Sequence, residues 1–448
     1  MSASPPDHGV TFRQAVRVWA YIGFNSFGGP SGQIAVMHRE LIDQRRWVSE
    51  RRFVHALNYC MVLPGPEAQQ LATYIGWLMH GVRGGVTAGG LFILPGFVAM
   101  MALSIIYAVW GSVTAVSGLL AGLQAAVIII VIQAFVRISR RILTTVVLRA
   151  VAALSFIAIF VFGIPFPIII IVAGLLGYFL ARTGRAPQEA ARAEDEPQAL
   201  LRDDVTIERA HHRSAMKAAI CFAVLWAVPV VLLVLVLGTD SVFTQEALFF
   251  SKAAVVTFGG AYAVLGYVAQ QAVDHYGWIT TADMATGLGL AETTPGPLIM
   301  VVQFVGFLGA YDNPGSLPPL VAGMLGAIVT VWVTFIPCFL FIFLGAPYAE
   351  RLRENAHLSH ALTYISAAVA GVILNLAVWF ALNTMFTEST PESWGPIKVS
   401  LPVLSSVDGA AIAIALVAAV LVFRFKMSTL RVLAVCSALG LLSAYVVN

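Results

Sequence analysis

The chain has 448 residues, of which 59% are hydrophobic and 11% are charged, and its mean hydropathy is +0.85. A soluble domain of this length cannot bury that much apolar surface, so the composition excludes a soluble globular protein. The net charge of +3 is small, and the basic residues fall in loops between apolar segments, which argues against nucleic acid as a partner. We therefore expect a polytopic membrane protein in contact with the lipid bilayer.

The first two apolar stretches differ from ordinary spanning helices because glycine and proline interrupt them. Residues 1–11 form an N-terminal tail without the basic start and apolar core of a cleaved signal peptide. Residues 12–37 are interrupted by the sequence FGGP, and residues 53–80 by the sequence PGP. An arginine-rich loop, residues 38–52, separates the two stretches.

Uninterrupted apolar stretches follow, each near the ~20 residues that cross a ~30 Å hydrocarbon core. They comprise residues 84–110, 114–136, 147–162 and 164–181. Residues 182–214 are charged and rich in alanine, which predicts a solvated linker. One connecting transmembrane helix, residues 215–238, leads from the linker to the rest of the chain.

Residues 244–448 repeat the landmarks of residues 12–181. SFGGP, which begins at Ser26, matches TFGGA, which begins at Thr257, and LPGP in the first part matches TPGP in the second. The tryptophans of RRWVS and YGWIT, Trp47 and Trp278, are separated by the same stretch of chain as Ser26 and Thr257, without a gap. We call this constant separation the repeat offset. Its recurrence over separate landmarks predicts an internal duplication, with one transporter repeat in each part.

Loop charge distinguishes two interpretations of the interrupted stretches, because basic loops lie preferentially in the cytoplasm. As single kinked helices, the stretches would place the arginine-rich loop 38–52 outside. As re-entrant hairpins, they place this loop, the loop at 137–149, the N-terminus and the linker in the cytoplasm. The second interpretation fits better. It predicts an all-α protein with two repeats of inverted topology, each with two re-entrant hairpins and about four spanning helices.

The breaks are the predicted functional site, because non-helical backbone at membrane depth must lie inside protein or beside water. A proline at the first helical position suits a new helix N-terminus, whose free N–H groups and dipole attract anions. Glycines let an anion approach the backbone closely. The alternative is that these residues only bend packed helices. The residues predicted to bind an oxyanion are Asn25, Ser26, Phe27, Gly28, Gly29, Pro30, Pro64, Gly65, Pro66, Gln70, Lys252, Thr257, Gly259, Gly260, Thr294, Pro295, Gly296 and Pro297.

Few ionisable residues lie near the breaks. Lys252, about two turns before its break, predicts either attraction of an anion or extension of its side chain to the membrane interface. Glu67 and Glu292 are candidate proton carriers, although Glu67 also suits an ordinary helix start. Three residues of the sequence MHRE fit either an entry funnel or a solvated charged face, and they are His38, Arg39 and Glu40.

Other cofactor signals are weak. The four cysteines have no CxxC spacing, which argues against a disulfide framework or a zinc site. His357 and His360 are one turn apart but have no obvious third ligand, so we predict no metal. The chain has no glycine-rich phosphate loop with its lysine, so we expect neither ATP-driven transport by this chain alone nor a cofactor.

The motifs FGGP, MHRE, RRWVSERRF, LPGP and LPGF, followed by TFGGA, YGWIT and TPGP, resemble the chromate ion transporter family, specifically its long two-domain members. The resemblance covers the chain apart from the tail and the linker. It implies a bacterial inner-membrane exporter of chromate, driven by the proton or electrical gradient, that confers chromate resistance, and it allows a homodimer. Ala261 replaces the proline after FGG in the second repeat, so the two halves need not contact the anion equally.

Two other functions compete with chromate export. One is transport of sulfate or another tetrahedral oxyanion, whose size and charge are similar to those of chromate. The other is a membrane-embedded enzyme that acts on lipids. Such an enzyme needs a cluster of acid, base or nucleophile at one membrane face, and the sequence offers none.

Overall fold

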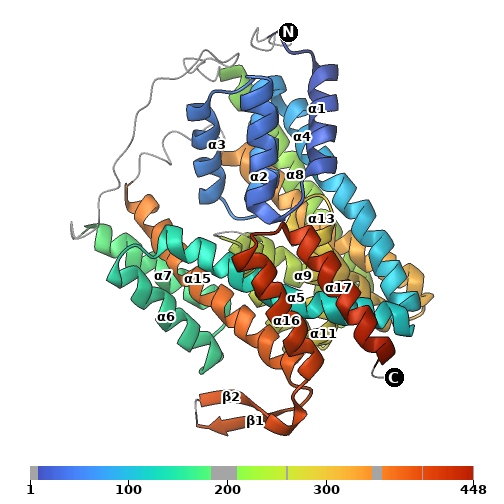
Figure 1. The fold of residues 1–448 in the computed structure, drawn as a ribbon. Helices are drawn as coiled ribbons and strands as arrows, with labels where there is room; N and C mark the ends of the chain where they lie inside the picture. Colours follow the sequence, from blue (N-terminus) through green and yellow to red (C-terminus); the bar gives the residue numbers. More distant parts are fainter. Residues whose placement is uncertain (1–8, 183–208, 259–260, 346–355, 396, 447–448) are drawn as a thin grey trace.

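The computed structural model describes residues 9–182, 209–258, 261–345, 356–395 and 397–446 (Figure 1). Among them, helices long and apolar enough to cross a membrane are Glu67–Trp110, Thr114–Ile142, Arg213–Leu237, Pro319–Gly345, His357–Met385 and Thr429–Val446. Shorter apolar helices are Val146–Phe160, Phe166–Arg182, Leu298–Asp312 and Gly409–Arg424. The chain is therefore a helical multi-pass membrane protein, as its composition predicts.

The first part of the chain contains the helices α1 to α7 and one π-helical segment, η1. Their bounds are α1 Phe12–Asn25, α2 Gly29–His38, η1 Arg39–Gln44, α3 Glu50–Val62, α4 Glu67–Trp110, α5 Thr114–Ile142, α6 Val146–Phe160 and α7 Phe166–Arg182. The predicted interruptions thus fall between α1 and α2 and between α3 and α4. Helix α4 is kinked at His80 and Gly81, whose backbone angles are not helical, so it joins part of the second interrupted stretch to the first predicted span.

One sequence interpretation in this part is wrong. Charge alone places the basic residues after 136 in a loop at 137–149, but α5 continues to Ile142 and carries Arg137, Arg140 and Arg141 in its last turns. The physical reason is that cations are favourable at a helix C-terminus, where the last carbonyl groups are unpaired. Arg137 therefore lies on a helix with a defined direction.

The second part follows α8, Arg209–Leu237, which covers the predicted connecting helix 215–238 except for its last residue. Its elements are α9 Val242–Val256, α10 Ala261–Ala269, η2 Gln270–His275, α11 Thr281–Thr293, η3 Leu298–Met300, α12 Val301–Asp312, α13 Pro319–Gly345, α15 Ala356–Met385, β1 Ser389–Trp394, β2 Ile397–Pro402, η5 Leu404–Ser406, α16 Gly409–Ala419, η6 Val420–Arg424 and α17 Thr429–Val446. Strands β1 and β2 pair antiparallel, with Ser389 opposite Pro402. No sequence pattern predicted this hairpin.

Local structure recurs at the repeat offset. The π-helical segments η1 and η2 begin one repeat offset apart. Ser49 caps the start of α3 through its side chain, and Thr280 caps α11 in the same way. The Trp47 amide donates to the Leu41 carbonyl at 2.7 Å, and the Trp278 amide donates to the Ala272 carbonyl at 2.9 Å. These helix starts, caps and backbone hydrogen bonds therefore recur at equivalent positions of the two parts.

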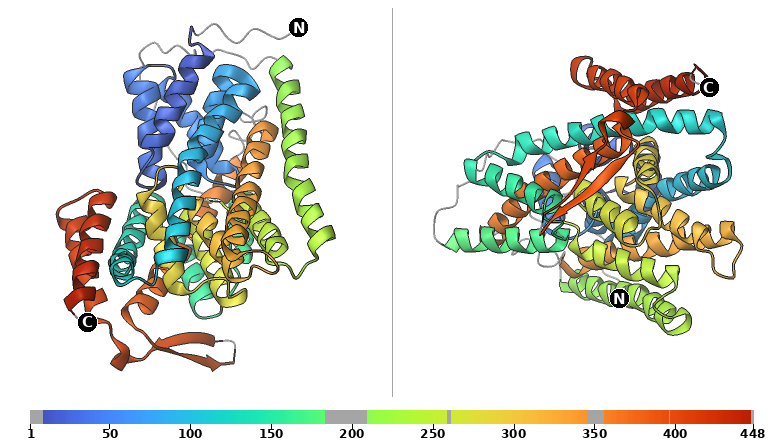
Figure 2. Two further views of the ribbon diagram at one scale, coloured as in Figure 1. Left: turned by 90° about the vertical axis from the view of Figure 1, so that its right-hand side faces the viewer. Right: turned by 90° about the horizontal axis from the view of Figure 1, so that it is seen from below.

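Helices α1, α2 and α3 lie at the end of the molecule that holds the N-terminus, and the β1–β2 hairpin lies at the opposite end (Figures 1 and 2). Helix α8 runs along the side of the molecule between these ends (Figure 2). Its apolar window has no buried residues, as expected for a helix in contact with lipid. The breaks between α1 and α2 and between α3 and α4 lie near the middle (Figure 1).

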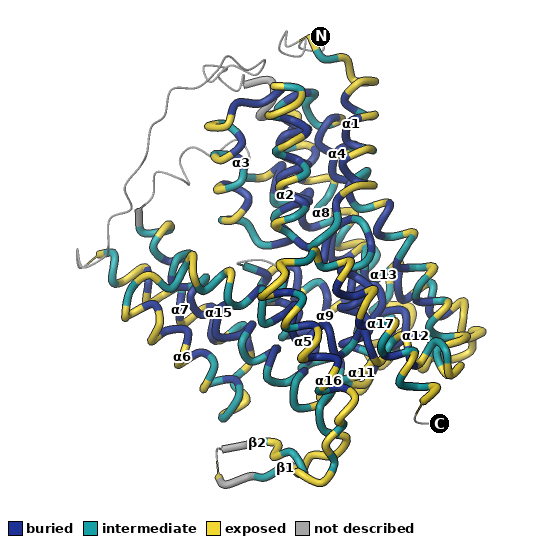
Figure 3. Tube along the Cα trace, viewed as in Figure 1, coloured by how far each residue is buried: buried dark blue, intermediate teal, exposed yellow. Residues whose placement is uncertain are grey.

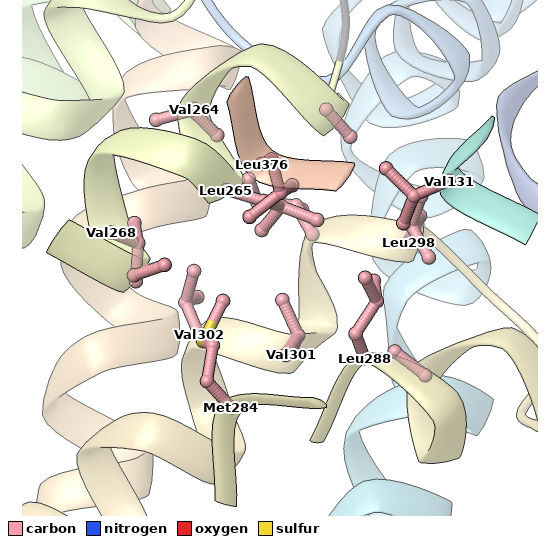
Figure 4. Packing of buried hydrophobic residues seen from close by; sticks show 14 of the residues in the cluster. Val131, Val264, Leu265, Val268, Met284, Leu288, Leu298, Val301, Val302 and Leu376 are labelled. Atoms are coloured by element: carbon pink, nitrogen blue, oxygen red, sulfur yellow. The ribbon is translucent and has the colours of Figure 1, made fainter. Parts of the chain in front are cut away.

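Buried residues, dark blue in Figure 3, form two hydrophobic clusters. The smaller core cluster joins residues of α1, α3 and α4, such as Trp19 and Trp77, to Phe343 of α13. The larger cluster joins Val131 of α5 to residues of α10, α11, η3, α12 and α15, such as Leu265 (Figure 4). Each part therefore contributes a helix to the core of the other.

Candidate functional site

The breaks of the two parts are joined by a pair of equivalent hydrogen bonds. The Gly65 amide donates to the Thr257 carbonyl at 2.8 Å, and the Gly296 amide donates to the Ser26 carbonyl at 2.9 Å. Ser26 and Thr257 are related by the repeat offset, as are Gly65 and Gly296. The PGP break of each part thus contacts the FGG break of the other.

The hydroxyl groups at the FGG breaks bond within their own helices. Ser26 Oγ donates to the Ile22 carbonyl at 2.6 Å, and Thr257 Oγ1 donates to the Ala253 carbonyl at 2.5 Å. Both bonds close the last turn of the preceding helix. Thr294 Oγ1 likewise donates to the Ala291 carbonyl at 3.1 Å. These hydroxyl protons are therefore already used in the described conformation.

The glycine of each PGP break adopts a backbone angle that favours glycine, with φ of +125° at Gly65 and +95° at Gly296. A proline-containing helix of the other part passes each glycine. A methyl group on Gly65 would lie 2.9 Å from Cys338 Sγ of α13, and one on Gly296 would lie 3.3 Å from the Gly96 Cα of α4. The two breaks are therefore packed tightly and in matching ways.

The prolines are displaced by one position from the prediction. Pro66 is the N-cap of α4, Pro297 is the N-cap of η3, and Pro30 is the second residue of α2. None of the three is the first helical residue. All three positions tolerate a residue without an N–H group, because the amides of a helix's first turn have no intrahelical partner.

The start of α2 faces a buried acid from the second part. Gly28 and Gly29 have φ of +82° and +69°. Apart from Gly28 and its two chain neighbours, no described residue has an atom within 4 Å of the place that a methyl group on Gly28 would take. A methyl group on Gly29 would lie 3.6 Å from the Tyr262 hydroxyl and 3.7 Å from Glu292 Oε1. The start of α2 therefore lies beside the Tyr262 hydroxyl and the Glu292 carboxylate of the second part.

Arg137 brings a positive charge to the same place. Its guanidinium donates to the Ser31 hydroxyl in the first turn of α2, and its charge acts on Glu292. Tyr262 donates its hydroxyl proton to the Glu292 carboxylate, and the Glu292 side chain is buried. The sequence prediction included Glu292 but missed Arg137, Ser31 and Tyr262. One feature of the sequence indicates that Arg137 belongs to the site, which is that it precedes the other arginines of α5 by about one turn.

Two glutamines hold the breaks in place. Gln33 Nε2 of α2 donates to the Gly296 carbonyl at 2.6 Å, and Gln70 Nε2 of α4 donates to the Pro64 carbonyl at 2.7 Å. Gln70 was predicted, whereas Gln33 was not. The Gln70 Oε1 atom is buried and has no hydrogen-bond partner among the described residues. It leaves one free acceptor beside the break.

The space between the breaks is small in this conformation. A cavity of about 10 Å³ lies between Gly65, Pro66 and Thr257, with Ile299 and Thr334 among its other lining residues. A volume of this size holds about one water molecule. This cavity is therefore too small for a tetrahedral oxyanion.

Other predicted site residues lie around this centre. Asn25 is exposed and donates to the Tyr21 carbonyl at 2.8 Å, and Phe27 is partly buried. Pro295 is part of the second PGP break, and its carbonyl packs against Gly96. Glu67 is the first residue of α4. Gly259 and Gly260 lie outside the described residues.

Lys252 and the MHRE residues have partners of their own. The Lys252 side chain is exposed on α9, and its charge acts on Tyr276. At the far end of α2, His38 Nε2 lies 2.5 Å from Glu50 Oε2. The buried Glu40 carboxylate pairs with the guanidinium groups of Arg39 and Arg45. Glu40 is thus paired inside the protein, whereas Arg39 is exposed.

Comparison with known proteins follows the same division of the chain. A sequence model of the chromate transporter family matches residues 13–178 and 244–441. A chromate transport protein of Pseudomonas aeruginosa is 34% identical over 83% of this chain and 81% of its own length. A probable chromate transport protein of Synechococcus elongatus is 27% identical over 82% of this chain and 84% of its own length.

A third relative, a chromate transport protein of Cupriavidus metallidurans, is 26% identical over 84% of either chain. No solved structure matches this chain. The family match covers most of the sequence on both sides of the linker, and it includes the four breaks. The protein therefore belongs to the chromate transporter family, as a long-chain member, and is a transporter rather than an enzyme.

Proposed function

We propose that the protein exports chromate from the cytoplasm by secondary-active transport and thereby confers chromate resistance. Its relatives are described as chromate transport proteins, which supports chromate as the substrate. The observation that carries the proposal is the meeting of the α2 start, the Arg137 guanidinium and the buried Glu292. Helix amides and a guanidinium are the groups that bind an oxyanion in proteins.

The proposed topology has two inverted repeats, residues 12–181 and 244–448, with the N-terminus and the linker 182–214 in the cytoplasm. The interrupted stretches enter the bacterial inner membrane as re-entrant hairpins. Support comes from the reciprocal bonds between breaks of different parts. Helix α8, which contains all but the last residue of the proposed connecting helix 215–238, runs along the side of the molecule from the end that holds the N-terminus toward the opposite end (Figure 2). Such repeats are common in secondary transporters.

In the proposed binding mode, chromate accepts hydrogen bonds from the amides at Gly28, Gly29 and Ser31 while Arg137 neutralises part of its charge. An ionised Glu292 would repel the dianion, so Glu292 is protonated while chromate is bound. The complex then carries one net negative charge outward. A membrane potential that is negative inside favours this movement by about 2.3 kcal/mol per 100 mV.

The other helix ends complete the proposed site from the second part. The breaks at Thr257–Gly260 and Thr294–Pro297 approach the anion when the repeats rock apart, which breaks the bonds from Gly65 to Thr257 and from Gly296 to Ser26. Lys252 attracts the anion from the surface of α9. His38, Arg39 and Glu40 form a cytoplasmic gate, and Glu67 provides a second acid beside the PGP break.

Arg137→Gln tests this site directly. A charge-assisted hydrogen bond contributes about 1.5–3 kcal/mol, so chromate export should fall at least roughly tenfold. Purified protein in liposomes, loaded with chromate and given a defined membrane potential, measures the rate. Arg140→Gln, three residues further along α5, is the matched control and should export at the wild-type rate. Wild-type export by Arg137→Gln would contradict the proposal.

Sulfate is the second candidate substrate, because a tetrahedral dianion of similar size meets the same amides and guanidinium. The same liposomes distinguish the two anions through competition. Excess sulfate should slow chromate export only weakly if the site prefers chromate. If sulfate competes at equal concentration and is itself transported faster, the protein is a sulfate transporter.

A further inference from the structure

Glu246 is a fully buried acid to which no sequence motif pointed. It lies in the second turn of α9, and its exposed fraction is 0%. Neither carboxylate oxygen has a hydrogen-bond partner among the described residues. The position one repeat offset earlier is Ala15, which is also buried, so this acid has no counterpart in the first part.

The two carboxylate oxygens of Glu246 lie at the interface between α12 and α13. A methyl group on Gly309 of α12 would lie 3.0 Å from Glu246 Oε1, and one on Gly326 of α13 would lie 3.0 Å from Oε2. Gly326 is seven residues, or about 10 Å, from the start of a spanning helix. The carboxyl group therefore lies inside the protein at membrane depth.

No charged side chain among the described residues acts on Glu246. An isolated ionised carboxylate in apolar surroundings would cost several kcal/mol, so the group holds a proton here. The described ionisable side chains on α9 itself and on the elements around it are Lys252 of α9, Arg213, Lys217 and Cys221 of α8, Tyr262 and Tyr267 of α10, Asp274 and His275 of η2, Tyr276 beside it, Tyr311 and Asp312 of α12, and Cys338 of α13.

Two further buried acceptors continue from Glu246 along α12. Thr330 Oγ1 and Gln303 Oε1 have no hydrogen-bond partner among the described residues. A methyl group on Gly306 would lie 2.1 Å from Thr330 Oγ1, so this oxygen faces α12 one turn before Gly309. Gln303 lies one turn before Gly306, and the whole series spans about 9 Å along the helix. It leads toward the break at Pro297.

We propose that Glu246 is a proton-transfer site, which takes the proton that Glu292 releases and passes it to the end of the molecule that holds the β1–β2 hairpin. Thr330 and Gln303 provide the acceptors along the route. One proton leaves Glu292 and one arrives at Glu246, which has first released its own proton at the outer end. This inference rests on the proposed function, because it supplies the path for the proton that accompanies chromate.

Glu246→Gln keeps the shape of the side chain and removes its ionisable proton. Full-length protein in liposomes is assayed for chromate counterflow, the exchange of labelled for unlabelled chromate without a gradient, and for chromate-dependent pH change in the lumen. Counterflow requires no proton release, so we expect at least half the wild-type rate. The chromate-dependent pH change should fall at least tenfold.

Asp408→Asn is the matched control. Asp408 caps α16 near the β1–β2 hairpin by accepting from the Ala411 amide, and asparagine caps a helix equally well. This variant should keep both activities. Wild-type proton movement in Glu246→Gln, or loss of counterflow in folded Glu246→Gln, overturns the inference. Absence of chromate counterflow in the wild type would instead overturn the proposed function.

A measurement on the wild type covers the case in which Glu246→Gln does not fold. A hydrophobic carbodiimide reacts with protonated carboxyl groups in apolar surroundings, and mass spectrometry locates the adduct. We expect the fraction of Glu246 that carries the adduct to match the fraction of chromate-dependent proton movement that is lost. Chromate counterflow should be retained. Loss of proton movement without an adduct on Glu246, or an adduct without that loss, contradicts the proposal.

Discussion

Gly65 shows how one residue links the two parts of the transporter. Its amide donates to Thr257 of the other part at 2.8 Å, and its φ of +125° is open to few residues other than glycine. A methyl group there would lie 2.8 Å from Gln70 Nε2 and 2.9 Å from Cys338 Sγ. Both the backbone angle and the close packing therefore require glycine at this position.

Gly65→Ala should therefore destabilise the protein. A strained backbone angle costs about 1–3 kcal/mol, and the close contacts add to it. The midpoint of thermal unfolding in detergent measures the loss. Gly90→Ala is the control, since Gly90 is in the middle of α4 and, apart from the neighbouring backbone of α4 itself, no atom of the described residues lies within 4 Å of an added methyl group. An equal midpoint for the Gly65→Ala variant and the wild type would show that the break tolerates a side chain.

At the scale of elements, α5 of the first part packs into the second. Gln124 Nε2 donates to Thr286 Oγ1 of α11 at 2.9 Å, and a methyl group on Gly289 of α11 would lie 1.9 Å from Leu123 Cδ2. In the second part, α13 packs against α4 and α8. The transporter therefore has interlocked parts rather than two independent bundles.

Gly289→Ala tests this packing through compensation. The added methyl group overpacks the contact, which typically costs about 1–3 kcal/mol, and Leu123→Ala alone leaves a cavity that costs about 2–5 kcal/mol. The double variant should lose less stability than the two single losses combined, because each change relieves the other. The midpoints of thermal unfolding of the wild type, the two single variants and the double variant form a double-mutant cycle that measures this coupling. Additive losses would mean that α5 and α11 are not in direct contact.

The elements were largely predictable from sequence, whereas the contacts of the site were not. Glycine and proline interrupt apolar stretches visibly, so the breaks near Gly28 and Gly65 were found. The end of α5 was misplaced because charge alone assigns the arginines after residue 136 to a loop. Arg137 meets Ser31 across more than a hundred residues, and Glu246 is buried by α12 and α13. Such contacts arise from tertiary packing, which local patterns do not encode.

At the scale of the whole molecule, the decisive question is how the two repeats lie in the membrane. Equivalent positions of parallel repeats lie on the same side, and those of inverted repeats lie on opposite sides. Arg51 and Ala282 are related by the repeat offset and both are exposed, just after the caps of α3 and α11. If the interrupted stretches were single kinked spans, Arg51 would face outward.

Variants with one added cysteine at either of these two positions test the topology. Cys221 is the exposed one of the four cysteines, so Cys221→Ser provides the background, and Cys60, Cys338 and Cys436 are buried. We expect a membrane-impermeant maleimide added to intact cells to label Ala282→Cys but to label Arg51→Cys only after the membrane is opened. Labelling of both variants in intact cells would favour parallel repeats. Labelling of Arg51→Cys alone would favour kinked spans, and the anion site would then have to be built without opposed helix ends.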